Sequence, residues 1–494
     1  MKKSYLIYIP NGLGSPELEL LLSTAQILID KKENVEIVTC LGGKNYTCSK
    51  NIFSQRSICM TCKSKRLNSF KKLKGKFDLT YTPELKNYDE FEGKFDLKNR
   101  ITINSSKIDG VDIGAATLSS YLDISRDANL DGLIARRTLK KLIKTTINLY
   151  FYFNKKLNKK HHIIIYNGRN SEYRPLLRIA NKKKIEISNL EWSGDGEKNI
   201  GIRNFKNHLV QDIDNMNKVI KNHWKNSSKE NKCDHYFHYI KAGRVVNDKA
   251  SYVLKQNKDL LPDEWDQSKR NIVYFTSSMD EYFALGGEFD KTIYKDQNAS
   301  LKKIIGSLKE INDKNIYFWV RCHPNLSNVF WKYNSDTFKF HDPKNRVFVI
   351  KPTSKISSYK MLLNCEKILN YNSRTGIEAV YWKKPSIVLG RSVFEKLNCI
   401  YKPKNHKETM KFILDKNLTP KSKLGPIKWA SYWVEGGYTQ KYFSGSLKDG
   451  FKFRNQYLKF GMVNKFIYYF GKITQHYFYN YVLNYKFSFL RKLK

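Results

Sequence analysis

The sequence predicts an α/β protein with two parallel sheets, each covered by helices. Near the start, apolar runs at residues 5–9 and 35–39 flank a helix-forming stretch at residues 16–30. This order of strand, helix and strand is typical of parallel strands that are joined by crossover helices. A second series of apolar runs begins at residue 271, after a polar stretch. Because the chain has 494 residues, it is long enough to form two cored domains.

Two further strands are predicted in the first half of the chain, at residues 163–166 and 185–190. Each runs into a polar loop that contains glycine, at residues 167–170 and 191–197. Between them lies a predicted helix that carries Arg174 and a second arginine one turn later on the same face. Since parallel strands end at the same edge of a sheet, we expect the two loops to lie at one edge.

The second half repeats the alternation of strands and helices. Its strands are predicted at residues 271–275, 316–320, 347–350, 367–370 and 385–389. The intervening stretches favour helices, so a separate parallel sheet is expected. The stretch before it is polar, rich in lysine and asparagine, and has little strand character. The expected parts are an N-terminal domain (1–205), a helical connector (206–260), a C-terminal domain (261–430) and a basic aromatic helical segment (431–494).

The end of the chain has a composition of its own. Residues 451–494 are dense in tyrosine, phenylalanine and lysine and contain few acidic residues. A basic, aromatic amphipathic segment could lie in the interface of an anionic membrane. It could equally be a terminal helix packed across the domains, because aromatic residues at helical spacing are often core. Both interpretations stay open.

The strong positive charge narrows the range of partners. Lysine and arginine number 89 against 46 acidic residues, which gives a formal net charge of +43 and favours anionic partners. The excess is spread along the chain, and the sequence contains no helix-turn-helix, zinc-finger or RNA-recognition pattern. We therefore expect a largely solvated basic surface and no nucleic acid partner.

The sequence predicts a cytoplasmic protein. The apolar run at residues 5–9 is too short for the core of a secretory leader and is better explained as a buried strand. No uninterrupted apolar stretch is long enough to span a bilayer. Attachment to the inner face of the membrane would then be peripheral.

Four of the eight cysteines cluster near the N-terminus: Cys40, Cys48, Cys59 and Cys62. Cys59 and Cys62 have the spacing of a zinc-ligand pair, and the other two could complete a set of four sulfur ligands. The first pair has seven intervening residues, which is unusual for a zinc ribbon. A structural zinc site and ordinary free thiols are both compatible with this pattern.

Two strand ends in the second half suggest a phosphate site, Arg321-x-His323-Pro324-Asn325 and Ser373-x-Thr375-Gly376-Ile377-Glu378. Arg321 could add charge, while His323, Ser373 and Thr375 could donate hydrogen bonds. The turn at Gly376 precedes a predicted helix start, where free backbone N–H groups bind phosphate. Glu378 could accept from ribose hydroxyls or interact with the helix dipole. Each string alone could also be an ordinary turn or helix start.

The loop at residues 191–197 offers candidates for a general base. Asp195 lies between two glycines and Glu191 ends the strand, although a Gly-Asp-Gly turn could also be chosen for its backbone geometry. Asn167, Arg169 and Arg174 could hold an acceptor, or the arginines could form ordinary ion pairs.

A metal-dependent reaction is not expected from the sequence. Asp212-x-Asp214 has the form of a metal-binding motif but lies in a polar, helix-forming stretch and not at a strand end. A metal-independent reaction follows, with no cofactor required for catalysis.

Taken in order, these motifs resemble those of bacterial capsule polysaccharide biosynthesis proteins, which are similar to Kdo and sialic-acid transferases of GT-B type. The resemblance covers about residues 160–440 and is carried by Asn167-Gly168-Arg169, Thr276-Ser277-Ser278 with Asp280-Glu281, Arg321-x-His323-Pro324-Asn325, Ser373-x-Thr375-Gly376-Ile377-Glu378-Ala379 and Lys384-Pro385-Ser386-Ile387.

The resemblance implies two Rossmann-like domains that face each other across a cleft, with the donor nucleotide in the C-terminal domain. It implies that His323, Ser373 and Thr375 hold the phosphate of a CMP-sugar, and that an acidic residue of an N-terminal-domain loop is the base. The chain has Gly194-Asp195-Gly196 where the sialyltransferases most like it would have Glu-Asp-Gly.

The resulting expectation is a glycosyltransferase that moves a sugar from a nucleotide-sugar donor onto a growing capsular polysaccharide or glycolipid. Two other enzyme activities also use loops of this kind: polyol-phosphate transfer and 2-epimerisation of a UDP-sugar. The alternative to an enzyme is a non-catalytic protein that binds polyanions mainly through its positive charge.

Overall fold

The computed structural model describes residues 3–42, 47–84, 91, 95–97, 99–126, 130, 132–192, 201–226, 234–243, 252–283, 285–327, 329, 332–446, 449–459, 466–467, 469–471 and 473. They divide into two compact units, each built around its own sheet. The first unit comprises Met1–Val210, Phe283–Gly286 and Gly437–Lys494, and the second comprises Gln211–Tyr282 and Gly287–Gly436.

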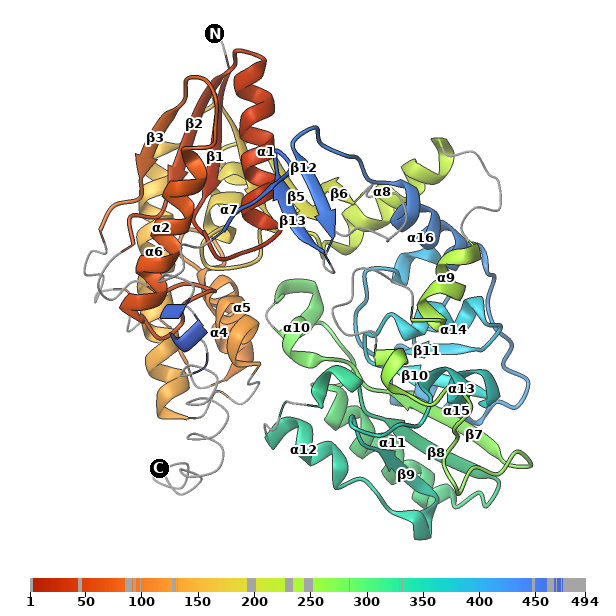
Figure 1. The fold of residues 1–494 in the computed structure, drawn as a ribbon. Coiled ribbons are helices and arrows are strands. Elements are labelled where there is room, and N and C mark those ends of the chain that lie inside the picture. The colour runs from red at the N-terminus through yellow and green to blue at the C-terminus, as the bar shows by residue number, and fades with distance from the viewer. Residues whose placement is uncertain are drawn as a thin grey trace. The chain divides into compact units, whose positions relative to one another are not determined.

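The first unit holds a six-stranded sheet with the order β3-β2-β1-β4-β5-β6 (Figure 1). Its strands are β1 (Ser4–Ile9), β2 (Asn34–Thr39), β3 (Asp78–Tyr81), β4 (His161–Tyr166), β5 (Ile187–Trp192) and β6 (Ile202–Asn204). The pairs among the first five strands are parallel, and β6 runs antiparallel to β5. The helices are α1 (Glu17–Asp30), α2 (Arg56–Phe70), α4 (Arg100–Ser105), α5 (Ile113–Ser125), α6 (Leu133–Lys156) and α7 (Arg174–Lys182).

Strand β1 shows why both faces of this sheet are covered. Leu6 and Tyr8 belong to one buried apolar cluster, whereas Ile7 and Ile9 belong to another. Because successive side chains of a strand point to opposite faces, an apolar run without alternation indicates a strand buried on both sides. The sequence of β1 therefore requires helices on both faces, as a parallel sheet provides.

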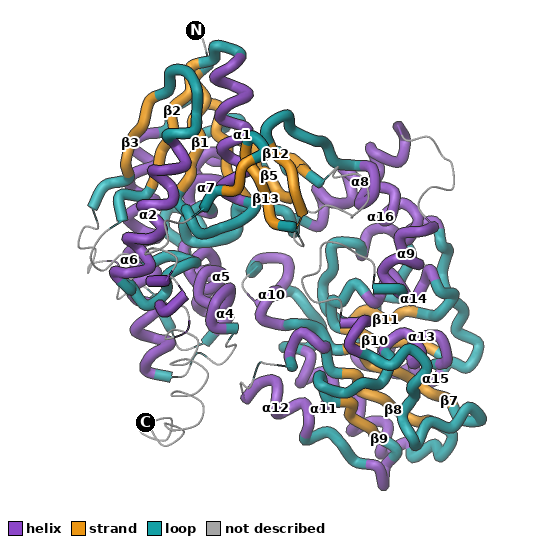
Figure 2. Tube along the Cα trace, in the orientation of Figure 1, coloured by secondary structure: helices purple, strands orange, loops and turns teal. Residues whose placement is uncertain are grey.

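The second unit holds a five-stranded, wholly parallel sheet with the order β11-β10-β7-β8-β9. Its strands are β7 (Arg270–Phe275), β8 (Ile316–Arg321), β9 (Val347–Ile350), β10 (Lys367–Asn370) and β11 (Ser386–Val388). Its helices are α8 (Ile213–Asn226), α9 (Asp234–Lys241), α10 (Met279–Phe283, which ends in the first unit), α11 (Gln297–Ile311), α12 (Lys332–Phe338), α13 (Ser358–Asn364), α14 (Thr375–Tyr381), α15 (His406–Leu414) and α16 (Leu424–Glu435). Figure 2 shows the strands of each sheet enclosed by helices. The predicted α/β fold with two Rossmann-like parallel sheets is confirmed.

Part of the segment expected to be helical forms strands instead. Strands β12 (Phe443–Ser446), β13 (Gly450–Phe453) and β14 (Gln456–Tyr457) make a small antiparallel sheet in the first unit. Phe451 and Phe453 are buried in the same cluster as β1 and α1, and the Phe451 ring lies 4.7 Å from that of Trp192. These aromatic residues are therefore core residues of the first unit.

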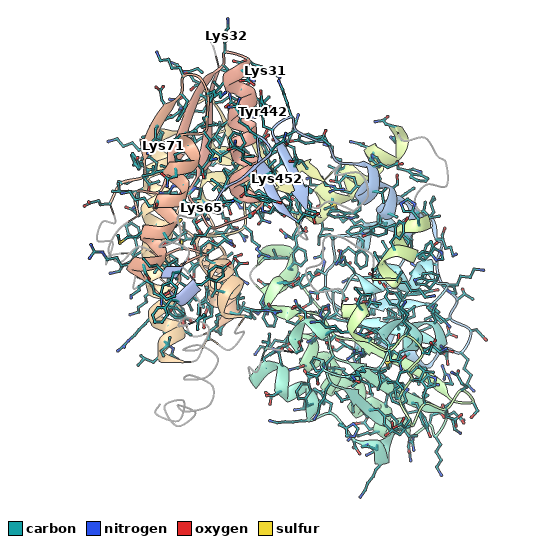
Figure 3. All side chains as sticks on the ribbon, in the orientation of Figure 1. Lys31, Lys32, Lys65, Lys71, Tyr442 and Lys452 are labelled. Atoms are coloured by element: carbon teal, nitrogen blue, oxygen red, sulfur yellow. The ribbon has the colours of Figure 1, made fainter. Side chains whose placement is uncertain are left out.

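Basic residues are abundant on the surface of both units. Exposed lysines occupy the C-cap positions of some helices, as Lys31 does in α1 and Lys71 does in α2 (Figure 3). Within the described residues, none of the helices combines the length and the apolar character needed to cross a membrane.

Candidate functional site

Three strand ends of the second unit meet at one edge of its sheet. The backbone N–H of His323, just after β8, donates to Thr276 Oγ1, just after β7, over 2.8 Å. The N–H of Asn372, just after β10, donates to Ser277 Oγ over 3.1 Å. The carboxyl-terminal edge of a parallel sheet is where open α/β folds bind ligands. The hydroxyls of Thr276 and Ser277 therefore fix the loops of His323 and Ser373 against one another.

The hydrogen bonds of His323 fix which ring nitrogen can donate. The N–H of Asn325 donates to His323 Nδ1 over 3.1 Å and caps the short helix Pro324–Leu326. A nitrogen that accepts this bond cannot carry the proton, so the neutral ring is protonated on Nε2. His323 Nε2 is thus a hydrogen-bond donor at the edge of the sheet.

The hydroxyls of the loop after β10 lie side by side. Ser373 Oγ and Thr375 Oγ1 are 3.0 Å apart, and the N–H of Thr375 points at Ser373 Oγ over 3.3 Å. Helix α14, which follows, is only seven residues long. Gly376 in its first turn lies directly over the end of β10, because a Cβ at that position would stand 2.6 Å from Asn370 Nδ2.

Two asparagines at this edge were missed by the sequence analysis. Asn370 is fully buried, yet neither its Nδ2 nor its Oδ1 has a hydrogen-bond partner in the protein. Asn372 is 3% exposed, and its Oδ1 also lacks one. An unpaired buried polar group costs about 1–3 kcal/mol, so such groups usually meet a ligand or a water molecule. The sequence does show one indication of Asn370, because this asparagine is the last residue of its strand and directly follows apolar residues.

Two residues predicted for donor binding are engaged by the protein itself. Arg321 is 1% exposed, and its guanidinium donates to the carbonyl oxygens of Lys351, Ser354 and Ile356, the first over 2.7 Å. In this structure the Arg321 side chain anchors the loop after β9. Glu378 accepts a 2.6 Å hydrogen bond from the Tyr359 hydroxyl, and burial raises the pKa of its carboxyl.

The matching sheet edge of the first unit carries buried carboxyls. Glu191, at the end of β5, accepts from Asn167 Nδ2 over 2.7 Å and from the Tyr166 hydroxyl over 3.4 Å. Burial raises the pKa of Glu191 to about 7, although the bond from Asn167 opposes that rise. This carboxyl can therefore exchange a proton near neutral pH, as a general base must.

Glu17, in the first turn of α1, is a second buried carboxyl that the sequence analysis did not identify. It accepts from Asn11 Nδ2 over 3.2 Å and from the Tyr173 hydroxyl. Burial raises the pKa of Glu17 to about 7, and the charge of Lys50 opposes that rise. An acidic residue in a first helical turn ordinarily indicates a favourable dipole interaction, so this burial could not be predicted from the sequence.

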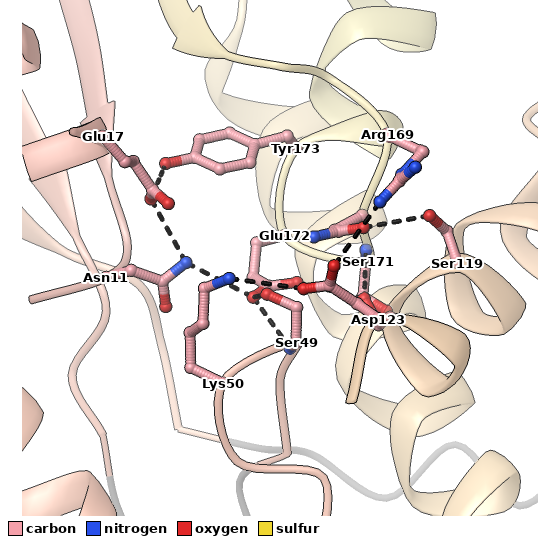
Figure 4. A network of polar contacts seen from close by, with 12 residues as sticks. Asn11, Glu17, Ser49, Lys50, Ser119, Asp123, Arg169, Ser171, Glu172 and Tyr173 are labelled. Carbon is pink, nitrogen blue, oxygen red and sulfur yellow. Dashed lines mark hydrogen bonds and ion pairs between the residues drawn. The ribbon is translucent and has the colours of Figure 1, made fainter. Parts of the chain in front are cut away.

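A network of polar contacts joins Glu17 and Asn11 to the segment after β4 that carries Arg169 and Glu172 (Figure 4). Glu172 Oε1 accepts from the Ser49 N–H over 2.9 Å and from Ser49 Oγ over 2.6 Å. Lys50 pairs with Asp123 over 3.3 Å, and Arg169 lies 3.5 Å from the same carboxylate. The buried Nε of Arg169 has no hydrogen-bond partner. One buried N–H of Arg169 therefore remains unpaired, and its predicted role in holding an acceptor stays a prediction.

Arg174 is differently placed. It is 2% exposed, pairs with Asp112 over 2.6 Å and donates to the Leu285 carbonyl over 2.9 Å. Burial alone would raise the pKa of Asp112, but Arg174 and Arg178 outweigh burial and lower that pKa to about 2. The contacts support the ion-pair interpretation that the sequence left open for Arg174.

Two remaining predictions concern the first unit. Asp195 belongs to residues 193–200, which lie outside the described residues. Cys40, Cys48, Cys59 and Cys62 are free thiols that line one cavity. In the described part of the chain, no three histidine, cysteine, aspartate or glutamate side chains form a group that could hold a metal ion.

Comparison with known proteins identifies the middle of the chain. Residues 202–401 match the family described as capsule polysaccharide biosynthesis protein. The chain matches no curated protein.

Several solved structures are similar to this chain at low identity. Thermosulfurimonas dismutans KpsC, beta Kdo 2,4 transferase, is 13% identical over 55% of this chain and 78% of its own, with a TM-score of 0.35. SnogD, a glycosyltransferase from Streptomyces nogalater, is 11% identical over 87% of this chain and 94% of its own, with a TM-score of 0.24. S. aureus MnaA with UDP is 10% identical over 88% and 93%, with a TM-score of 0.27.

Proposed function

We propose that this chain, whose residues 202–401 match the family of capsule polysaccharide biosynthesis proteins, is a glycosyltransferase that extends a surface polysaccharide. Its donor is a nucleotide-activated sugar, and a CMP-linked sugar of the Kdo or sialic-acid type is the first candidate because of the motif series. Its acceptor is a growing capsular polysaccharide or a glycolipid.

The observation that carries this proposal is the edge of the second sheet. Hydrogen bonds from the N–H groups of His323 and Asn372 hold three strand ends together there, and the buried amide of Asn370 has no partner in the protein. The phosphate of a sugar nucleotide accepts hydrogen bonds, and its sugar or base can form hydrogen bonds with an amide side chain. The unpaired amide groups therefore support a bound ligand at this edge.

In the proposed reaction, negative charge develops on the donor phosphate as the bond to the sugar breaks. His323 Nε2–H and the hydroxyls of Ser373 and Thr375 would stabilise that charge, and fixed donors in a site shielded from water act strongly. Asn325 positions the His323 ring through its N–H. A carboxylate of the first unit would take the proton of the acceptor hydroxyl, and Glu191 and Asp195 are the proposed bases.

We propose that this reaction needs no metal ion at Asp212-x-Asp214. Asp212 Oδ1 accepts from the N–H of Asn215 over 2.8 Å and so caps the start of α8. Asp214 forms an ion pair with Lys396. These contacts assign both carboxylates to holding α8 in the second unit.

Nucleotide binding tests the proposal directly. CMP at about 100 times its dissociation constant should raise the free energy of unfolding by about 2.7 kcal/mol. Asn370→Ala should abolish this shift while leaving the ligand-free melting temperature equal or higher, because it removes unpaired buried groups. Asn364→Ala, at the end of α13 and before the amino end of β10, is the control for loss of an asparagine away from the site. The proposal would be contradicted if none of CMP, CDP and UDP stabilised the protein. If the protein epimerised a UDP-sugar without an acceptor, it would be an epimerase and not a glycosyltransferase.

We also propose that the enzyme acts at the cytoplasmic face of an anionic membrane. Phe466, Phe470 and Ile473 are 75%, 62% and 64% exposed. This short stretch packs beside the start of α2, since a Cβ on Gly471 would lie 3.3 Å from Ile58, and Met60 nearby is 61% exposed. Exposed apolar side chains on a strongly basic protein suit a surface of anionic lipid.

Removing residues 460–494 should weaken co-sedimentation with vesicles that contain phosphatidylglycerol by about tenfold or more, with little effect on folding. A cut at residue 451 would be uninformative, because Phe451, Phe453 and Leu458 are buried core residues worth about 1.5–3 kcal/mol each. Phe466→Ser with Phe470→Ser keeps the full length, and Tyr457→Ser is the control at an exposed aromatic residue. Equal binding by all four proteins would contradict the membrane proposal.

A further inference from the structure

Helix α6 carries a row of cations on one side. Arg136, Arg137, Lys140 and Lys141 are all exposed. Because an α-helix has 3.6 residues per turn, these positions fall on one side of α6, and Leu133, which is 63% exposed, begins the same side. We call these five residues the basic face of α6. The 24 residues of the helix include no acidic residue that could offset this charge.

The direction of the basic face is fixed by the core of the first unit. On the opposite side of the same turns, Ala135, Leu139 and Leu142 are buried. Turning the cations inward would expose these apolar side chains to water, which is unfavourable. The basic face is therefore a lasting part of the surface of the first unit.

The basic face lowers the stability of its own helix. Arg136 lies one turn before Lys140, and such pairs of like charge destabilise a helix. Arg137 and Lys141 form a second pair of this kind, and cations near the amino end of a helix also oppose its dipole. Within the described part of the chain, none of the four cations forms an ion pair with a carboxylate. A group that costs stability in this way is typical of a surface kept for a partner.

The exposed apolar stretch near the C-terminus lies beside α6. A Cβ on Gly471 would stand 3.3 Å from Ile58 of α2, and Ile58 lines the same cavity as Thr145 of α6. Thr145 follows Lys141 by about one turn of the helix. Phe470, next to Gly471, is 62% exposed. The basic face and this apolar stretch are therefore neighbouring parts of one surface.

We propose that the basic face of α6 binds the headgroups of an anionic bilayer, beside the exposed side chains of Phe466, Phe470 and Ile473. The cations attract acidic headgroups, and the exposed Leu133 can enter the boundary between headgroups and acyl chains. This face supplies the electrostatic part of the membrane attachment proposed above and rests on that proposal. It takes no part in binding the donor.

Other polyanions fit the basic face less well. Sites for single-stranded nucleic acid combine cations with aromatic side chains on which bases stack, and the basic face has no aromatic residue. An acidic polysaccharide would bind the cations but would leave Leu133 in water. A lipid surface uses both the charge and the apolar side chain.

Replacing the four cations of the full-length protein by glutamine tests this assignment. Each cation near an anionic bilayer contributes about fivefold to binding, so partitioning onto vesicles that contain phosphatidylglycerol should fall about tenfold or more. The melting temperature should stay equal or rise, because glutamine is a good helix former and the like-charge pairs are lost. The variant combines Arg136→Gln, Arg137→Gln, Lys140→Gln and Lys141→Gln.

A matched control removes the same amount of charge from the second unit, at four exposed lysines. This control should bind the vesicles within about twofold of the parent, because charges away from the bilayer contribute little. Stabilisation by CMP should be unchanged in both variants, which separates this test from that of the glycosyltransferase proposal. The control combines Lys302→Gln, Lys303→Gln, Lys314→Gln and Lys344→Gln.

Three outcomes would overturn the role of α6. Equal loss of vesicle binding in the two variants would assign the effect to net charge. Unchanged binding by the α6 variant, together with loss of binding on removal of residues 460–494, would leave the membrane proposal standing without α6. An α6 variant that keeps vesicle binding but no longer binds an acidic polysaccharide would assign the basic face to a glycan.

Discussion

Replacing His323 with asparagine is expected to lower kcat/KM for the sugar-nucleotide donor by about 10²–10³-fold, the usual effect of removing one preorganised donor to a developing charge. The physical reason is the tautomer, because the Asn325 N–H occupies Nδ1 and leaves the proton on Nε2. Asparagine is an efficient N-cap, so the new side chain can still accept the Asn325 N–H. It cannot place a donor where Nε2 was.

His341→Asn provides a matched control for this experiment. His341 Nδ1 also accepts a backbone N–H, that of Val349, over 3.1 Å. However, His341 precedes β9, so it lies toward the amino ends of the parallel strands, away from the proposed site. Both variants should melt within about 1 °C of the parent protein. Equal donor turnover by the two variants would exclude His323 from catalysis.

The His323 site shows what the sequence could predict. A strand that ends in a polar motif places its loop at the carboxyl edge of a parallel sheet, and two such motifs must then lie near each other. The hydrogen bonds of Thr276 and Ser277 agree with that inference. The fold class followed from the same regularity, because continuous apolar runs such as that of β1 require helices on both faces.

The roles of individual charged residues could not be predicted in the same way. Arg321 is a reasonable phosphate ligand by its position, but its guanidinium is used by carbonyl oxygens of a loop some thirty residues later. Glu17 is buried, and its carboxyl accepts a hydrogen bond from Tyr173, 156 positions away. Such partners depend on tertiary structure, which local patterns do not encode.

The C-terminal segment shows a different difficulty. Its aromatic residues suggested a helix, but Phe451 and Phe453 alternate with polar residues at the spacing of a strand. Short aromatic stretches satisfy both periods, and the burial of these two rings against the first unit decides between them.

The pH dependence of the reaction should identify the base. If Glu191 accepts the acceptor proton, kcat/KM should fall about tenfold per pH unit below its pKa of about 7, because only the ionised carboxylate is active. If the base were a glutamate with an ordinary pKa, kcat/KM would not change with pH until the pH fell to about 5. Glu191→Gln should lower kcat/KM by about 10²–10⁴-fold at pH 8.

Asn167→Ala and Glu17→Gln distinguish Glu191 from its neighbours. The bond from Asn167 lowers the pKa of Glu191, so Asn167→Ala should move the acidic limb of the pH profile to higher pH. A base elsewhere, such as Asp195, would show no such movement. If the limb disappears in Glu17→Gln and persists in Glu191→Gln, then Glu17 is the base.

Stability provides a check that does not depend on substrate. Because the folded pKa of Glu191 lies above the unfolded value near 4.5, its neutral form stabilises the fold at low pH, and this contribution is lost as pH rises from about 4.5 to 7. The loss amounts to roughly 3 kcal/mol for a carboxyl so deeply buried. Glu191→Gln should remove this part of the pH dependence, so its melting temperature should exceed that of the parent at pH 8 and match it at pH 4. If the parent and Glu191→Gln show the same change in stability between pH 4.5 and pH 8, then Glu191 does not titrate in this range and the acidic limb needs another origin.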